Sequence, residues 1–252
     1  MDVGGSGIKA GVVDIEAGKL VSDRLRVDTP KPSTPPAVVT AVRELVDRLD
    51  EPGTVGIGFP SVIRHGVVYT ANNIDKSWIG VNALEMFEDA IGREIRLIND
   101  ADAAGLAECR YGAARGVSGV VLVLTFGTGI GSALFLDGKL TPNTEAGQLE
   151  LNGARPAETR YSAKARRKDN LSWDEWGERA REFITLAYEV LNPDLVVIGG
   201  GVSKFWDEFA SHVSFDEVLT TPAALANNAG IIGAAAVAFG DEPQRLNSAN
   251  WA

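Results

Sequence analysis

The stretch Asp2-Val-Gly-Gly-Ser-Gly-Ile-Lys9 and its counterpart Thr125-Phe-Gly-Thr-Gly-Ile-Gly131 are each followed by a run of β-prone apolar residues. A glycine turn that leads into such a run predicts a β-hairpin. Gly-Ser-Gly-Ile at position 5 aligns with Gly-Thr-Gly-Ile at position 127, an offset of 122 residues, and Gly-Lys-Leu follows both copies. An offset of about half the chain predicts an internal duplication with one hairpin in each half and a cleft between them.

The rest of the chain predicts strands that alternate with helices. Buried strands are expected at 54–59, 95–98 and 195–198, and apolar residues at helical spacing predict helices near 38–49, 101–111, 172–191, 204–209 and 231–239. This alternation predicts an α/β fold, with ligands bound where strands end in loops.

Composition excludes several classes of protein. The 252 residues are 45% hydrophobic and 23% charged, which predicts a globular chain with a sizeable core. A formal charge of −10 argues against nucleic acid or an anionic membrane as the main partner. The single cysteine, Cys109, excludes an internal disulfide and a multi-cysteine zinc site. With no signal pattern and no apolar run long enough to span a bilayer, we expect a cytoplasmic protein.

The two hairpins are candidate phosphate sites. Glycine turns allow backbone N–H groups to approach a phosphate closely, and the Ser6 and Thr128 hydroxyls add donors. One such loop is more often a plain turn, whereas two self-similar loops favour phosphate binding. Lys9 would add a positive charge, and Asp2 could hold a hydrated Mg²⁺. The predicted phosphate-binding residues are Asp2, Gly4, Gly5, Ser6, Gly7, Lys9, Thr125, Gly127, Thr128 and Gly129.

A third glycine cluster follows the strand expected at 195–198. It has neither the spacing of a dinucleotide fingerprint nor the lysine of a P-loop, so it is either a nucleotide-binding turn or a plain strand-to-helix turn. The predicted nucleotide-binding residues are Gly199, Gly200, Gly201, Val202 and Ser203.

Asn99 and Asp100 lie between a predicted strand and a predicted helix. Residues of these types most often cap a helix N-terminus, but Asp100 closes a strand on the cleft side, where a carboxylate could accept a proton from a substrate hydroxyl. The polar stretches 72–78 and 143–150 contain amides and carboxylates that suit the hydroxyls of a sugar and equally suit a surface loop.

These motifs occur in the order seen in the repressor/open-reading-frame/kinase (ROK) family of sugar kinases, and the chain resembles that family over nearly its whole length. Within the family the likeness is greatest to the polyphosphate-dependent glucokinases of actinobacteria, on the stretches 71–80, 171–176 and 227–233. The resemblance implies an actin-like ATPase fold of the hexokinase and ROK type, with two lobes and a central cleft. We place the first lobe at 1–103 with the helix 231–240 returning to it, the second lobe at 104–230, and a frayed tail at 241–252.

The resemblance also implies residue roles and partners. Asp100 would be the base that deprotonates the 6-hydroxyl of glucose, the donor would be inorganic polyphosphate, ATP or both, and Mg²⁺ would be the cofactor, with no zinc. Homodimers are usual among such relatives. The residues implied to hold the sugar are Asn73, Asn99, Glu145, Gln148 and Glu158.

Three departures from the family pattern leave alternatives open. Gln148 stands where the family has a sugar-binding histidine, Ser61 stands where many relatives have glycine, and the strand that anchors Asp2 is expected to be short. The alternatives are a strictly ATP-dependent kinase for another hexose such as mannose, and a non-catalytic sugar sensor on the same fold.

A basic segment interrupts the acidic chain. Between Arg155 and Lys168 there are six basic residues and one acidic residue. Such a segment is either a solvated helix face or a track for the tail of a polyanionic donor. The residues of this predicted polyphosphate track are Lys164, Arg166, Arg167 and Lys168.

Overall fold

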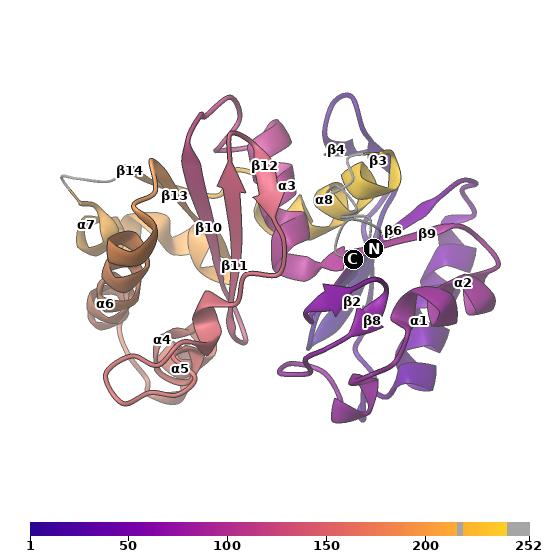
Figure 1. The fold of residues 1–252 in the computed structure, drawn as a ribbon, viewed down its shortest axis with the longest axis horizontal. Helices are drawn as coiled ribbons and strands as arrows, with labels where there is room; N and C mark the ends of the chain where they lie inside the picture. Colours follow the sequence, from indigo (N-terminus) through magenta and orange to yellow (C-terminus); the bar gives the residue numbers. More distant parts are fainter. Residues whose placement is uncertain (216–218, 241–252) are drawn as a thin grey trace, which may run out of the picture.

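The computed structural model describes residues 1–215 and 219–240 and contains two five-stranded sheets with helices between and around them (Figure 1). The predicted tail at 241–252 lies outside the described residues. The strands of the first sheet are β1 (Asp2–Val3), β2 (Gly7–Ala10), β5 (Leu25–Asp28), β6 (Val55–Phe59) and β9 (Ile95–Asn99), and those of the second are β10 (Val120–Phe126), β11 (Ile130–Leu136), β12 (Lys139–Thr141), β13 (Leu195–Gly200) and β14 (Leu219–Pro222). Two short hairpins join β3 (Val13–Asp14) to β4 (Lys19–Leu20) and β7 (Ile63–Arg64) to β8 (Val67–Val68).

The helices expected near 38–49, 101–111, 172–191 and 231–239 are present, and the structure also contains shorter helices that the sequence signals do not predict. The helices are α1 (Pro35–Leu49), α2 (Ala83–Ile91), α3 (Asp100–Tyr111), α4 (Glu158–Tyr161), α5 (Ala163–Lys168), α6 (Trp173–Leu191), α7 (Ala210–Val213) and α8 (Ala229–Ala238), with 3₁₀ turns η1 (Lys76–Trp78), η2 (Ala146–Gln148), η3 (Gly201–Glu208) and η4 (Ala226–Asn228). The helix expected at 204–209 is the exception, because that segment lies mostly in the 3₁₀ stretch η3. None of the helices within 1–215 and 219–240 is long and apolar enough to cross a bilayer.

The two sheets have the same design. Their strand orders are β5-β2-β1-β6-β9 and β12-β11-β10-β13-β14. In each sheet an antiparallel hairpin is extended by two parallel strands beside its first strand. Because both glycine stretches form the turns of equivalent hairpins, the structure confirms the predicted duplication. The copies differ at Gly11 and Val12, where the strand equivalent to β11 is interrupted between β2 and β3.

Both faces of the second sheet are buried, as an α/β fold requires. Leu122, Leu124 and Phe126 of β10 pack on one face, in a core that includes Trp176 and Phe183 of α6. The alternate residues of β10 face the opposite side, toward the end of α3. The alternation follows from the two-residue period of a strand.

Helices α3 and α8 pack against each other between the sheets (Figure 1). Helix α3 contacts strands of both sheets, and α8 contacts β1, β6 and β9 of the first. The backbones of the two helices approach each other closely at Gly233, where an added Cβ would lie 1.7 Å from the carbonyl oxygen of Ala103. A lobe boundary at residue 103 would fall inside α3, so the division of the chain into lobes stays a prediction.

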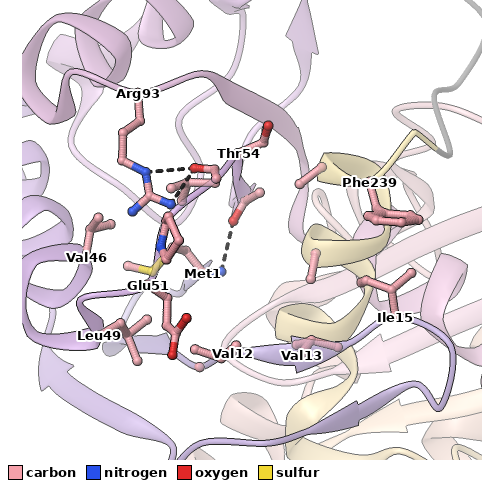
Figure 2. A pocket seen from close by; sticks show the side chains of 17 residues that line it. Met1, Val12, Val13, Ile15, Val46, Leu49, Glu51, Thr54, Arg93 and Phe239 are labelled. Carbon is pink, nitrogen blue, oxygen red and sulfur yellow. Dashed lines mark hydrogen bonds between the residues drawn. The ribbon is translucent and has the colours of Figure 1, made fainter.

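Strand β1 is only two residues long, but it is paired on both sides. Asp2 lies opposite Lys9 of β2 and Gly58 of β6, and the Met1 amine donates a hydrogen bond to the Gly56 carbonyl at 2.9 Å. The amine borders a cavity of about 330 Å³ between the β2–β3 connection, α1, β6 and the end of α8. Figure 2 shows Met1 among the residues that line this cavity. Burial lowers the pKa of the amine to about 6. Asp2 is therefore held in the centre of its sheet.

Candidate active site

A cleft of about 290 Å³ lies between the two glycine hairpins and is lined by residues of both sheets. Its walls are formed by glycine turns and by carboxylate and amide side chains. Such convergence of polar groups is typical of a ligand site. The predicted residues that line it are Asp2, Gly4, Gly5, Ser6, Lys9, Asn73, Asn99, Asp100, Thr125, Gly127, Thr128, Gly129, Glu145, Gln148, Glu158, Gly199, Gly200 and Gly201.

The remaining predicted residues are absent from this lining. Val202 is only 1% exposed and packs in the core, because the chain turns at Gly200, which has a φ of 80°, and enters η3. The Ser203 hydroxyl donates to the Gly200 carbonyl at 2.9 Å. Gly7 lies in β2 against the Arg26 guanidinium. The four residues of the predicted polyphosphate track, Lys164, Arg166, Arg167 and Lys168, lie on α5 outside this lining.

Asn99 and Asp100 each have one of the two roles expected for their motif, a helix cap and a group that faces the cleft. Asn99 caps α3, since its Oδ1 accepts from the N–H groups of Ala101 at 2.9 Å and Asp102 at 3.0 Å. Its Nδ2 donates to the Ser61 carbonyl at 3.1 Å. With the capping role filled by its neighbour, Asp100 faces the cleft. Both the oxygen and the nitrogen of the Asn99 amide thus already have protein partners. Its role as a sugar ligand stays a prediction.

The environment of Asp100 suits a general base. Burial, reinforced by the negative charge of Asp2, raises the pKa of the Asp100 carboxyl to about 7. A hydrogen bond from the Ala101 N–H and the positive charge of Lys9 act in the opposite direction. A base with a pKa near the working pH combines basicity with a useful ionised fraction.

Asp2 and Lys9 form an ion pair on the first hairpin. Because the two residues are opposite each other in the β1–β2 register, the Lys9 Nζ lies 2.9 Å from the Asp2 Oδ2. Proteins hold Mg²⁺ with one or two carboxylates together with substrate phosphates and water, so Asp2 fits this role. Among the described residues no group of three or more His, Cys, Asp or Glu side chains could form an all-protein metal site.

Each hairpin turn lies against a predicted sugar-binding residue. A Cβ on Gly5 would lie 2.8 Å from the Asn73 carbonyl oxygen, and one on Gly129 would lie 2.1 Å from the Glu158 Oε2. A larger side chain would have to displace the Asn73 backbone at Gly5 and the Glu158 carboxylate at Gly129. The phosphate-binding turns and the predicted sugar residues therefore adjoin each other in one cleft.

Carboxylates and amides gather at the predicted sugar-binding end. Glu145 precedes η2, Gln148 ends it, and the Glu158 Oε2 accepts from the Ile130 N–H at 3.1 Å. Burial, followed by the negative charges of Asp100 and Glu158, raises the pKa of Glu145 to about 7. These side chains offer both donors and acceptors to hydroxyl groups.

Glu108 also lines the cleft, and no local pattern in the sequence indicates its role. Its side chain is buried on α3, and Oε2 accepts from the N–H groups of Ala113 at 2.8 Å and Ala224 at 3.0 Å. Its Oε1 accepts from Leu225 at 2.8 Å. Glu108 therefore fixes the loop between β14 and η4, which forms one wall of the cleft.

Duplicated sheets that flank a cleft, with a glycine hairpin in each, define an actin-like ATPase fold of the hexokinase type. The chain belongs to the ROK family, whose model matches residues 1–150. It is 43% identical to the polyphosphate glucokinase of Mycobacterium tuberculosis (strain CDC 1551 / Oshkosh) over 242 residues, which cover 96% of this chain and 91% of that protein.

Solved structures agree with this assignment. The inorganic polyphosphate/ATP-glucomannokinase of Arthrobacter sp. strain KM superposes with a TM-score of 0.91 at 47% identity, over 94% of this chain and 96% of that chain. A ROK family glucokinase from Streptomyces griseus, solved with glucose and AMPPNP, has a TM-score of 0.81 at 24% identity, over 94% of this chain and 97% of that chain, and so shares the fold. The family and fold predicted from the sequence are confirmed.

Proposed function

We propose that this protein is a glucokinase that transfers the terminal phosphoryl group of inorganic polyphosphate or ATP to the 6-hydroxyl of glucose. The observation that carries the proposal is the position of Asp100, a carboxyl with a pKa near 7 in a cleft that also contains both glycine hairpins. The names of the mycobacterial and Arthrobacter relatives support the choice of donors and of sugar.

Asp100 acts as the base in this proposal. As the 6-hydroxyl oxygen attacks the terminal phosphorus, its proton passes to the Asp100 carboxylate. The bond between that phosphorus and the bridging oxygen breaks, and the shortened polyphosphate or ADP leaves with the electron pair. The hairpin N–H groups hold the donor phosphates in line. Mg²⁺, held by Asp2 and the donor, would neutralise phosphate charge.

We propose that helix α5 carries the tail of a polyphosphate donor. The Lys164 N–H donates to the Gly127 carbonyl at 3.0 Å, so α5 begins directly beside the second hairpin. Lys164, Arg167 and Lys168 are exposed, and their spacing places Lys164 on the same helix face as the other two. Arg166 instead stacks on Trp173, with its Cζ 3.7 Å from the ring centroid. Lys164, Arg167 and Lys168 are therefore exposed to solvent, whereas Arg166 is engaged with Trp173.

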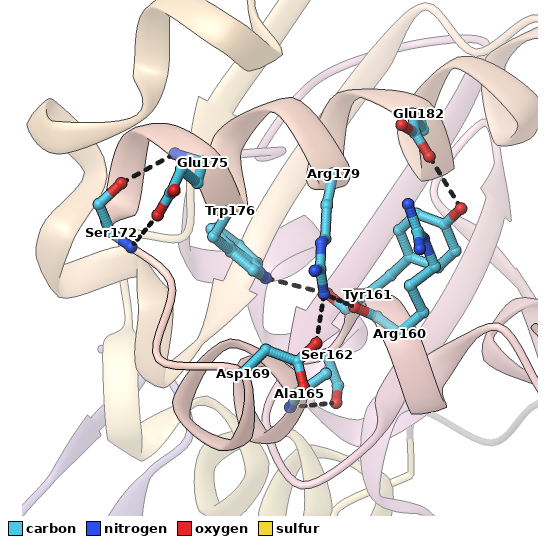
Figure 3. A network of polar contacts seen from close by, with 10 residues as sticks. All are labelled: Arg160, Tyr161, Ser162, Ala165, Asp169, Ser172, Glu175, Trp176, Arg179 and Glu182. Carbon is cyan, nitrogen blue, oxygen red and sulfur yellow. Dashed lines mark hydrogen bonds and ion pairs between the residues drawn. The ribbon is translucent and has the colours of Figure 1, made fainter.

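Side chains of α6 hold the residues on either side of α5 (Figure 3). The Trp176 indole N–H donates to the Tyr161 carbonyl at 3.0 Å, and the Tyr161 hydroxyl donates to Glu182 at 2.9 Å. Arg179 pairs with Asp169 at 2.6 Å, beyond the last residue of α5. Because the residues that flank α5 are held in place, this segment loses less conformational entropy on binding a polyanion than a flexible segment would.

A coupled assay for glucose 6-phosphate with each donor tests the proposed reaction. We expect product with polyphosphate and with ATP, and no product from either donor at high glucose would overturn the proposal. Calorimetry distinguishes the sensor alternative, for which glucose would bind tightly without turnover. Mannose is included as a second acceptor because the Arthrobacter protein is named a glucomannokinase.

The role of α5 has its own test. Replacing Lys164, Arg167 and Lys168 together by Gln should raise the KM for polyphosphate and flatten its salt dependence, while the KM for ATP stays unchanged. The matched control replaces exposed Lys19, Lys31 and Arg48, which lie outside α5, and should leave both donors unaffected. Equal losses for both donors would refute the track.

We further propose that the protein acts as a homodimer in the cytoplasm, without a nucleic-acid partner. The acidic net charge supports the last point. Light scattering of the purified protein tests the oligomeric state, and a monomer at micromolar concentration would contradict it.

A further inference from the structure

Asn143 connects the two halves of the cleft. It follows β12 of the second sheet, and its side-chain Oδ1 accepts from the N–H of Ile63 at 2.9 Å while its Nδ2 donates to the carbonyl of Ile63 at 3.0 Å. Ile63 begins β7, which precedes the last strand of the first sheet. The amide thus satisfies both backbone groups of one residue. Asn143 has a φ of 62°, a conformation that asparagine tolerates better than most residues.

The backbone of Asn143 is held by a second group. Its N–H donates to the Asp102 Oδ2 at 2.7 Å. Asp102 lies in the first turn of α3, two residues after Asp100, and is only 1% exposed. Its other oxygen is buried and has no hydrogen-bond partner among the described residues. A carboxyl buried in this way is costly, so the contact with Asn143 is its main compensation there.

Thr144 and Ala146, the residues on either side of Glu145, are both fixed to Ser132 of the second sheet. The Thr144 hydroxyl donates to the Ser132 carbonyl at 2.9 Å, and the Ser132 hydroxyl accepts from the Ala146 N–H at 2.9 Å. Glu145 is therefore flanked on both sides by tethers to Ser132 of β11, and a second tether, at Asn143, joins the same loop to α3 and β7. The second tether is the one that links the position of Glu145 to the helix bearing Asp100.

We propose that Asn143 and Asp102 are positioning residues that hold the Glu145 loop at a fixed distance from Asp100, and that they set the affinity for the sugar. The inference rests on the proposed function, because it assumes that Glu145 contacts the sugar. Neither residue lines the cleft. Their effect arises because the first turn of α3 presents Asp100 to the cleft and Asp102 to the sugar-binding loop.

Replacing Asn143 with Gly removes the amide and keeps the positive φ accessible. We expect the Kd and KM for glucose to rise on the order of tenfold, from the loss of two hydrogen bonds, with the KM for the donor unchanged. Asn192→Gly is the matched control. Asn192 also has a positive φ, of 43°, but it is exposed at the end of α6, so its replacement should leave the kinetic constants unchanged.

Two variants of Asp102 separate positioning from simple stability. Asp102→Asn retains an oxygen that can accept from Asn143 and should keep a glucose KM close to that of the wild type. Asp102→Ala should raise it as Asn143→Gly does, and because the two substitutions remove different contacts of the same loop, the double variant should be at least as impaired as either single one. Melting temperatures are recorded for each variant, and the rise in glucose KM should not follow the loss of melting temperature across the set; a KM that rises in step with that loss would overturn the inference.

An Asn143→Gly variant with unchanged glucose affinity would overturn the inference, as would a loss shared equally by glucose and donor. Because glucose binding is measured by calorimetry as well as by turnover, the outcome does not depend on catalysis. A wild-type protein that binds glucose without phosphorylating it contradicts the proposed function but still allows this test. A wild-type protein that does not bind glucose contradicts both.

Discussion

Replacing Asp100 with Asn should remove most of the activity and stabilise the protein. Burial raises the pKa of the carboxyl from 3.8 to about 7, which means that ionised Asp100 is less favourable in the folded state than in the unfolded one. That shift corresponds to roughly 4 kcal/mol, an upper limit because the side chain is partly exposed to the cleft. Since the amide introduced by Asp100→Asn never ionises, we expect the variant to recover about 1 to 3 kcal/mol at pH 8.

The sign of the pH dependence follows from the raised pKa. Between about pH 4 and pH 7 the unfolded chain loses the Asp100 proton while the folded chain keeps it, so rising pH favours unfolding of the wild type. The stability gain of Asp100→Asn should therefore be small at pH 4 and complete by pH 8. In parallel, the value of kcat/KM for glucose should fall by about 10² to 10⁴.

Urea unfolding of the substrate-free protein at several pH values measures the first effect, and the coupled assay measures the second. Asp207→Asn, at an exposed position in η3, is the control and should change neither. An Asp100→Asn protein that is no more stable than the wild type at pH 8 would refute the assignment of a buried, destabilised carboxyl. A variant that keeps substantial activity would remove Asp100 from the role of base.

Three further substitutions test other parts of the cleft. Gly129→Ala should displace the flexible Glu158 carboxylate, 2.1 Å from the new Cβ, and lower glucose affinity in calorimetry with little change in melting temperature, whereas Gly127→Ala meets open space and should not. Glu108→Gln places an amide N–H₂ against backbone N–H groups and should lower the free energy of unfolding in urea by about 1 to 3 kcal/mol. Gln148→His should raise glucose affinity several-fold, and an unchanged Kd would show that the amide replaces the family's imidazole fully.

Local sequence signals predict the hairpins, the central strands and the helices α1, α3, α6 and α8, but not α2, α4, α5 and α7. The hairpins follow from glycine turns next to apolar runs, and the start of α6 follows from Ser172 and Glu175, which form a capping box in the structure. The duplication was visible because both copies kept the same turn. The strand order of the first sheet could then be expected to repeat in the second.

Contacts between distant residues could not be predicted in this way. Asn143 meets Ile63 across 80 residues, and Glu108 meets Leu225 across 117, and neither pair leaves a periodic pattern in the sequence. Val202 is predicted at the nucleotide site because it follows a glycine cluster, whereas the structure packs its side chain in the core after the turn at Gly200, and its role at the site stays a prediction. Tertiary packing decides such positions.

The return of α8 to the first sheet has a consequence for synthesis of the chain. Ala234 of α8 packs against Gly56 of β6, and Val237 shares a core with Ile98 of β9. On a ribosome, where about 5 to 20 residues are added each second, the nascent β6 emerges about ten seconds or more before the helix that covers it. During that interval the apolar surface of β6 and β9 lacks its cover, so a chaperone that binds nascent chains should engage the first sheet until Ala238 has emerged.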